Sequence, residues 1–308
     1  MAMRLRSGRV SDVETYARLI NAQHQWLRNE NLWEIDELAA LLVTPSSDPV
    51  RYDRYLEVDG TVVAGLHTHA SPPYEKVTFH LASPPEPNRE AHARYLLEAG
   101  LRLLRGRPEL SPAAAISIDV PSEDEELTSL VRSMGFARTN QVAIMQATID
   151  NAPEPTWPDG FTVQTFDFES DLQAAFSIIS SAFANQPAWW HIDQDDFVYM
   201  LQNDPTARRG ISVLVTHGDV PAAISVNFAD TTLADTGLIG LLAVAPGFQG
   251  RGLGRAILLE SFVRFRAQDW QYARLATIYG YRPGEPSLYN AVGMKPMYFN
   301  DMFVRSLD

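Results

Sequence analysis

The sequence has no cysteine and almost no lysine. Without cysteine, a disulfide framework, a thiolate metal site and a cysteine nucleophile are all excluded. Lys76 and Lys295 are the only lysines, so arginine carries nearly all the positive charge. A mechanism through a lysine Schiff base is therefore disfavoured.

Long apolar runs and a positive charge balance are also missing. No stretch has enough consecutive apolar residues to span a bilayer, and the N-terminus lacks a signal-peptide pattern, so we expect a cytoplasmic protein. The net charge of −13 argues against nucleic acid and anionic membranes as partners. Two interpretations of this acidic balance remain open: it keeps the protein soluble, or it favours a cationic acceptor such as an amine.

The length and the turn residues together predict two domains. A chain of 308 residues suits two domains of ordinary size. The segment 151–160 holds three prolines and ends in glycine, which is typical of a linker. We therefore expect one domain over 1–150 and a second over 161–308, joined by this segment.

The two halves repeat the same order of elements. Each half predicts a strand, two helices, a hairpin, a strand, a longer helix, a strand, a short helix and a final strand. Gly135 and Gly293 are 158 residues apart and each follows the short helix, with Leu130–Phe136 aligned on Leu288–Met294. Ser11 and Ser170, before the first helix of each half, are 159 apart. A constant register over most of each half predicts a tandem duplication of one α/β domain.

The strongest local pattern is a glycine-rich turn in the second half. The apolar run 237–244 predicts a buried strand, 253–267 predicts a helix, and Gly247, Gly250, Gly252 and Gly254 mark the turn between them. A turn at a helix N-terminus leaves backbone N–H groups unpaired at the positive end of the helix dipole, and glycine lets an anion approach them. We expect a phosphate or pyrophosphate there.

The first half lacks this pattern. Asn88, Ala91 and Ala93 align with Gln249, Gly252 and Gly254 of the second half, and a loop with three prolines precedes them. Side chains at the two glycine positions make the first half poorly suited to holding a phosphate.

Two motifs together resemble a known family. Gln249-x-x-Gly252-x-Gly254, after a strand that ends in Val244-x-Pro246, resembles the acyl-CoA signature of the GNAT N-acetyltransferase superfamily. Leu288-Tyr289, four residues before Gly293, resembles the later motif of that superfamily. The likeness covers essentially all of 160–308, and the first half resembles a degenerate copy. Two such domains in one chain are similar to the layout of mycothiol synthase and related tandem GNAT proteins.

The resemblance implies a fold and a co-substrate. Each domain would be a mixed, mostly antiparallel twisted sheet flanked by helices. Acetyl-CoA would be held by the backbone of Leu242, Ala243, Val244, Gln249, Gly250, Arg251, Gly252, Leu253, Gly254 and Arg255. The first three of these residues would pair with the pantetheine and the rest would hold the pyrophosphate. An N–H near Val244 would polarise the thioester carbonyl.

The resemblance also implies direct transfer of the acetyl group to a small amine, bound in the cleft between the two domains. Tyr289 would protonate the departing thiolate as general acid. Its counterpart in the first half is Val131, which has no proton to donate. A non-catalytic first half is therefore expected.

The sequence departs from the family pattern at two positions. The central strand carries only glycine and aliphatic residues where many members have a glutamate base, and Asp235 is the nearest carboxylate. The general base is thus unassigned. Arg282 lies near the place where many members have a cofactor-contacting asparagine, and either a coenzyme A phosphate or a surface salt bridge would explain it.

Other candidate residues have two interpretations each. Trp189, Trp190, His191 and Asp193 suggest either an aromatic wall and a base for the acceptor, or a loop between two helices that packs on the other domain. His67 and His69 alternate along a strand and so share a face, which suits metal binding. No third ligand is evident, so no metal is expected.

The function expected from the sequence is therefore an acetyl-CoA-dependent N-acetyltransferase with its active site in the second domain. One alternative is a non-catalytic acyl-CoA-binding or interaction protein, because the strand carboxylate is missing and the first half is degenerate. Another is an acyltransferase that uses a different acyl-CoA donor or an oxygen acceptor.

Overall fold

The computed structural model describes residues 2–70, 74–111, 113–184, 193–207, 210–280 and 285–308. The chain divides into two compact units. Unit 1 consists of Met1–Gln141, Trp190–Tyr199 and Asn300–Asp308, and unit 2 of Val142–Trp189 and Met200–Phe299.

Unit 1 is built on a mixed sheet with the strand order β1-β2-β3-β4-β5-β12. Only β4 and β5 are parallel, and the other neighbours are antiparallel. Its strands are β1 (Met3–Ser7), β2 (Arg54–Val58), β3 (Thr61–Ala70), β4 (Lys76–Ala82), β5 (Ala115–Pro121) and the end of β12 (Lys295–Ser306). Its helices are α1 (Val13–Arg28), α2 (Ile35–Leu42), α3 (Pro49–Tyr52), α4 (Arg89–Arg105) and α5 (Glu125–Ser133).

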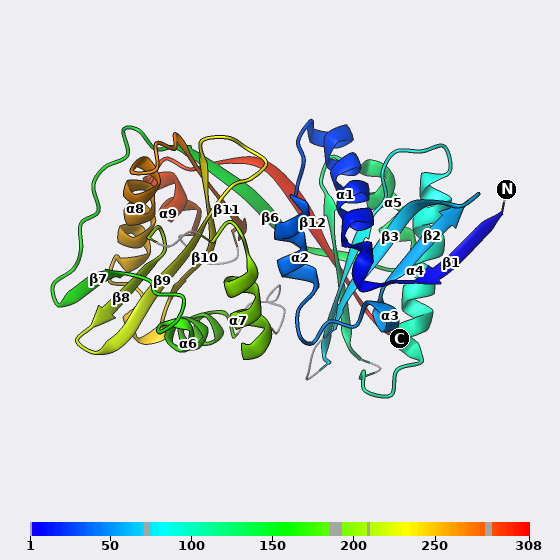
Figure 1. Cartoon of the computed structure of the whole chain (residues 1–308), viewed down its shortest axis with the longest axis horizontal. Coiled ribbons are helices and arrows are strands. Elements are labelled where there is room, and N and C mark those ends of the chain that lie inside the picture. The colour runs from blue at the N-terminus through cyan, green and yellow to red at the C-terminus, as the bar shows by residue number, and fades with distance from the viewer. Residues whose placement is uncertain (1, 71–73, 112, 185–192, 208–209, 281–284) are drawn as a thin grey trace. The chain divides into compact units, whose positions relative to one another are not determined.

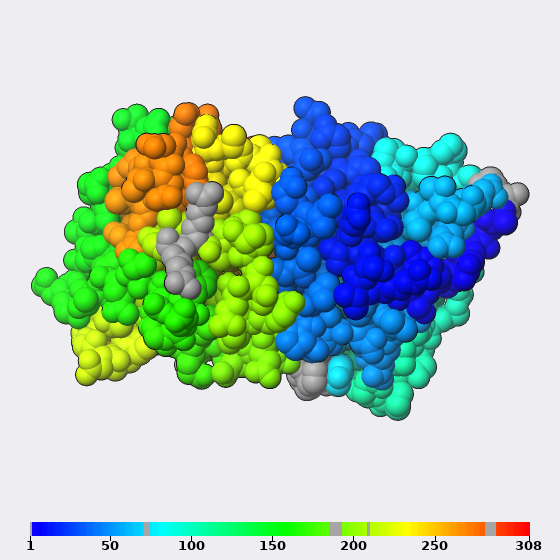
Figure 2. All heavy atoms as spheres, viewed as in Figure 1, coloured from blue at the N-terminus to red at the C-terminus, as the bar shows by residue number. Residues whose placement is uncertain are grey.

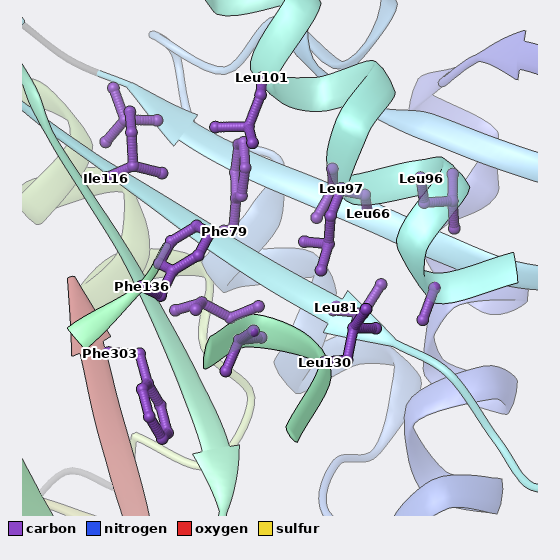
Figure 3. Packing of buried hydrophobic residues seen from close by; sticks show 14 of the residues in the cluster. Leu66, Phe79, Leu81, Leu96, Leu97, Leu101, Ile116, Leu130, Phe136 and Phe303 are labelled. Carbon is purple, nitrogen blue, oxygen red and sulfur yellow. The ribbon is translucent and has the colours of Figure 1, made fainter. Parts of the chain in front are cut away.

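One core of unit 1 lies between its sheet and the helices α4 and α5, and a second, which includes Leu19, Leu38 and Tyr55, lies against α1 and α2. Figure 3 shows Phe79 from β4 and Leu97 from α4 in the first of these cores, together with Phe303 from β12, and all three are fully buried. Gly100 brings α4 close to the sheet, since a Cβ there would lie 2.6 Å from Leu66 Cδ2. Apolar residues that alternate along the strands thus supply one buried face of the sheet.

Unit 2 has an equivalent sheet with the order β6-β11-β10-β9-β8-β7, in which only β10 and β11 are parallel (Figure 1). Its strands are β6 (Ala137–Thr148), β7 (Phe161–Thr165), β8 (Val213–His217), β9 (Val220–Ala229), β10 (Thr236–Val244) and β11 (Tyr272–Ile278). Its helices are α6 (Leu172–Phe183), the end of α7 (Gln194–Asn203), α8 (Leu253–Arg266) and α9 (Glu285–Ala291). The expected fold class, two mixed and mostly antiparallel α/β sheets, is confirmed.

The last strand of each sequence half lies in the other unit. The segment 142–148 of β6 pairs with β11 of unit 2, whereas 300–306 of β12 pairs with β5 of unit 1. The sequence predicted that a strand over 141–149 closes the first half, and its placement is different. An alternating strand specifies which face is buried but not which sheet edge it joins, so the repeat alone did not reveal this exchange. The domain bounds 1–150 and 161–308 stay a prediction.

Local turn signals are placed as expected, with one correction. Asp59 and Gly60 form the β2–β3 turn with φ of 48° and 83°, the left-handed pair that a tight hairpin requires. Ser11 and Glu14 have the spacing of a capping box, but the N-cap of α1 is Asp12, whose carboxylate accepts the Arg9 N–H at 2.8 Å and a hydrogen bond from the Arg6 guanidinium at 2.7 Å. Among the residues with described positions, no helix combines the length and apolar character needed to cross a bilayer.

Candidate functional site: the strand edge and turn between β10 and α8

Strands β10 and β11 begin as a parallel pair and then stop pairing. Their register runs from Thr236–Tyr272 to Ile239–Leu275. Beyond that point β10 continues to Val244, still paired with β9, and β11 continues along β6. The segment 241–244 of β10 therefore has an edge that β11 does not cover. We call this segment the open edge of β10.

A β-bulge at Gly240 accompanies the end of this pairing. Ile239 is opposite Asn227 of β9, and Leu241 is opposite the adjacent residue Val226, so Gly240 is the extra residue of the bulge. A Cβ at Gly240 would lie 2.4 Å from the ring of Phe228, so only glycine fits beneath that ring. A bulge bends and twists its strand, which explains why β10 leaves β11 here.

The glycine-rich turn follows β10 directly. A 3-10 turn over Pro246–Phe248 precedes Gly250 and Gly252, whose φ values of 75° and 87° are left-handed. A Cβ at either glycine would meet no atom within 4 Å. The turn thus adopts a backbone that glycine requires and leaves open space beside it.

This turn presents a continuous row of backbone donors. The first backbone N–H of α8 with a carbonyl acceptor is that of Ala256, which bonds to Gly252 O at 3.1 Å. For the N–H groups from Gly250 to Arg255, no acceptor exists in the described parts of the chain. They lie at the positive end of the α8 dipole, as an anion site requires. The residues 249–252 are exposed, and Figure 2 shows the segment that includes α8, in orange, at the surface of the molecule.

Two side chains of the turn donate hydrogen bonds to backbone carbonyls within or just before the turn. Gln249 Nε2 donates to Val244 O at 3.0 Å, and Arg251 donates to Gly247 O at 3.2 Å while its guanidinium lies 5.4 Å from the Phe248 ring centre. Both were predicted to bind the cofactor through their backbone. Their side chains shape the turn and leave the backbone N–H groups available to an anion.

The second motif lies beside the first. Leu288 of α9 is at van der Waals distance from Gly254, because a Cβ at Gly254 would lie 3.6 Å from Leu288 Cδ2. The next residue, Tyr289, is buried and its hydroxyl lies 3.3 Å from Thr277 Oγ1. Thr277 belongs to β11 beyond the last residue that pairs with β10. The phenol is therefore held on the β11 side of the place where the two strands part.

The corresponding place in unit 1 has its own charges. Arg89, the counterpart of Gly250, donates to Ser83 O at 2.7 Å and to Asp124 at 2.9 Å, and both charged side chains are buried. Burial opposes the charge on Arg89, but hydrogen bonds to Asp124 and Glu126 raise its pKa above the ordinary value. At the start of α4, Glu86 accepts the Asn88 N–H at 3.2 Å and lies 2.7 Å from His92 Nδ1.

A carboxylate therefore already occupies the helix start where a phosphate would bind. The adjacent open groove, of about 500 Å³, is lined in part by Glu90, Glu98 and Glu126 and also by Arg94, which pairs with Glu90 at 3.0 Å. The carboxylates outnumber the guanidinium among these residues, so the lining disfavours an anionic ligand. The arrangement supports the prediction that the first half does not hold a phosphate.

The remaining candidates have other positions. Asp235 precedes β10 at the end opposite Val244, roughly 30 Å away at the usual rise of a strand, so it is not suited to be the base beside the open edge. Asp193 accepts the Asp196 N–H at 2.8 Å and caps α7. His67 Nδ1 lies 3.0 Å from Asp53 Oδ2. Trp189, Trp190, His191 and Arg282 lie outside the described residues.

Sequence reasoning missed two polar features of unit 2. Thr277 supports Tyr289, and Ser225, Asn227 and Ser261 form a buried network behind the bulge. Polar residues inside otherwise apolar strands were the available signal.

Comparison with known proteins places this arrangement in context. No protein-family model matches the chain. A mycothiol acetyltransferase from Thermomonospora curvata is 26% identical over 246 residues, which cover 76% of each chain. Among solved structures, a GCN5-related N-acetyltransferase from Sphaerobacter thermophilus has a TM-score of 0.77 at 19% identity and covers 99% of this chain and 96% of its own. A tandem GNAT protein from the clavulanic acid biosynthesis pathway has a TM-score of 0.72 at 14% identity. The match covers 100% of this chain and 99% of that protein.

Proposed function

We propose that the chain is a tandem-domain member of the GNAT superfamily and an acyltransferase, and that it transfers the acetyl group of acetyl-CoA to a small amine in unit 2. The observation that carries the proposal is the row of backbone donors from Gly250 to Arg255 at the end of the open edge of β10. The donors suit a pyrophosphate, and the open edge suits an extended amide-containing arm. Coenzyme A has both parts.

Each group of residues has its own role in the proposed reaction. The N–H groups of the turn bind the pyrophosphate, and the backbone of 242–244 pairs with the pantetheine amides. The acceptor nitrogen attacks the thioester carbonyl, and an N–H near Val244 stabilises the oxyanion. The C–N bond forms first, and the C–S bond breaks when the oxyanion collapses, as Tyr289 gives its proton to the departing thiolate and regains one from water. The proton lost by the amine passes to water.

The acceptor is a small primary amine. The sequence relatives are named mycothiol acetyltransferases, which makes deacetylated mycothiol the first acceptor to assay. The net charge of −13 favours a cationic acceptor over an anionic one. Its location between the two halves stays a prediction.

A coupled assay tests the activity. Release of coenzyme A thiol from acetyl-CoA is measured with a panel that contains deacetylated mycothiol, amino sugars and polyamines, and acetylated product is identified by mass spectrometry. We expect release that depends on one class of amine. Binding of acetyl-CoA without release for any amine would support the alternative of a non-catalytic acyl-CoA-binding protein. A longer-chain acyl-CoA that replaces acetyl-CoA would support the other alternative, a different donor.

The stoichiometry of acetyl-CoA binding is a separate prediction. We expect isothermal titration calorimetry to give one site per chain, because Arg89, Glu86 and the acidic groove occupy the equivalent place in unit 1. The variant Ala91→Gly restores the glycine at the counterpart of Gly252 and serves as a control. Because the charges of unit 1 remain, we expect it still to bind one equivalent. Two equivalents in the wild type would contradict the assignment of these charges.

A further inference from the structure

Between β9 and α8, three buried side chains form a closed ring of hydrogen bonds. Asn227 Nδ2 donates to Ser261 Oγ at 3.1 Å, Ser261 Oγ donates to Ser225 Oγ at 3.0 Å, and Ser225 Oγ donates to Asn227 Oδ1 at 2.8 Å. All three residues have 0% exposure. Ile257 O also lies 3.0 Å from Ser261 Oγ and shares its proton. We call these three residues the Asn227 ring.

Asn227 has further bonds beyond the ring. Its second amide hydrogen goes to Ile211 O at 2.6 Å, and its backbone N–H donates to Ser212 Oγ at 2.9 Å. Both side-chain donors are thus used, as a fully buried amide requires. Through these bonds one residue connects β9 to the segment before β8 and, by way of Ser261, to α8.

The position of the ring coincides with the point where β10 changes direction. Asn227 is directly opposite Ile239, the last residue of β10 that pairs with β11. The next residue is the bulged Gly240. Ser261 lies in the middle of α8, away from its N-terminus, and its bond to Ser225 joins this part of the helix to β9. Figure 1 shows β9, β10 and α8 as neighbours in unit 2.

Packing alone does not explain this ring. Three apolar side chains could fill the same space without the desolvation cost of a buried amide and two hydroxyls. The hydrogen bonds fix the register of β9. A shift of β9 by one residue would leave each of these polar groups unpaired, and the free energy of the lost hydrogen bonds opposes that shift. A fixed register of β9 stabilises the bulge at Gly240, because that bulge depends on the alignment of β9 and β10.

We propose that Asn227 is a positioning residue, which acts through Ser225 and Ser261 to hold the β10 bulge and so sets the open edge of β10 against the start of α8. This inference rests on the proposed function, in which that edge receives the pantetheine arm. The ring does not contact the turn of Gly250 to Arg255, so it acts on the arm and the thioester but not on the pyrophosphate.

Two variants test this role. Ser261→Ala removes one member of the ring and keeps a strong helix former on α8. Asn227→Ala removes its centre. Thr206→Val is the matched control, because it deletes another buried hydroxyl of unit 2, which bonds to Asp204 at 2.6 Å and is outside the ring.

Two readouts separate positioning from general stability. Hydrogen exchange of the unliganded protein reports on the segment 240–244, and calorimetry compares acetyl-CoA with 3′-phospho-ADP, the nucleotide part of coenzyme A without its arm. We expect faster exchange of 240–244 in both ring variants. We expect affinity for acetyl-CoA to fall about tenfold, while affinity for 3′-phospho-ADP is unchanged. The control variant should match the wild type in both measurements.

Unchanged exchange in the segment 240–244 of Ser261→Ala would overturn the inference, and so would an equal loss of affinity for both ligands. If Asn227→Ala does not fold, Ser261→Ala alone decides. A wild-type protein that binds neither ligand would refute the proposed function, whereas the exchange of 240–244 in the variants would still decide the role of the ring.

Discussion

Gly252→Val is expected to abolish the binding of acetyl-CoA. Gly252 has a φ of 87°, where a β-branched residue is strongly disfavoured, and it is the N-cap of α8. Valine would either shift the backbone or place its side chain in the open space beside the donors. Loss of two charged hydrogen bonds at about 1.5–3 kcal/mol each predicts roughly 10²- to 10⁴-fold weaker binding. Isothermal titration calorimetry measures this loss.

A matched control separates this effect from backbone strain. Gly60 has a φ of 83° in the β2–β3 turn of unit 1, and a Cβ there also meets nothing within 4 Å. Gly60→Val therefore imposes the same type of backbone strain at a position that is distant in sequence from the N–H donors of Gly250 to Arg255. We expect it to lower the melting temperature but to bind acetyl-CoA like the wild type. An affinity of Gly252→Val within about tenfold of the wild type would reject the turn as the pyrophosphate site.

The elements that the sequence predicts well are those whose ends have local chemical causes. The short helix expected before Gly135 extends over Glu125–Ser133, because Asp124 caps it at Leu127 N and Gly135 adopts the left-handed conformation after it. The strand, turn and helix around Gly252 are equally local. Neighbouring residues alone determine these features, so pattern analysis is sufficient for them.

Features that depend on distant partners were not predictable in this way. The bulge at Gly240 requires the ring of Phe228, twelve residues earlier in the sequence and adjacent only after β9 and β10 pair. A glycine inside an apolar strand signals a close approach but not its partner. The exchange of the last strands and the Asn227 ring could not be predicted for the same reason. Alternation along one strand indicates which residues are buried, but it does not indicate which other strand or side chain they contact.

The prediction that the first half has no anion site illustrates both cases. Ala91 and Ala93 in place of glycines were visible in the sequence and predicted a poor phosphate site. That Glu86 supplies its own carboxylate to the start of α4, and that Arg89 is bound to Asp124, required the folded arrangement. When a carboxylate of the same chain already accepts hydrogen bonds at a helix N-terminus, a bound phosphate adds little further stabilisation there.

Tyr289→Phe is expected to lower turnover much more than affinity. The phenol hydroxyl lies 3.3 Å from Thr277 Oγ1, on the strand that has parted from β10, and the variant removes the proton donor without changing the buried ring. General acid catalysis contributes about 10²- to 10⁴-fold, so kcat should fall by roughly that factor, while the Kd of acetyl-CoA stays within about twofold of the wild type.

Steady-state kinetics and calorimetry measure the two quantities. Tyr272→Phe is the matched control, because Tyr272 lies at the opposite end of β11, in the first residue pair with β10. It should leave kcat unchanged. The Tyr289→Phe variant also tests the interpretation of Tyr289 as a packing residue only. A phenylalanine fills the same space, so a purely structural role predicts wild-type turnover. Wild-type kcat in Tyr289→Phe would therefore reject the general acid and leave the proton of the thiolate to water.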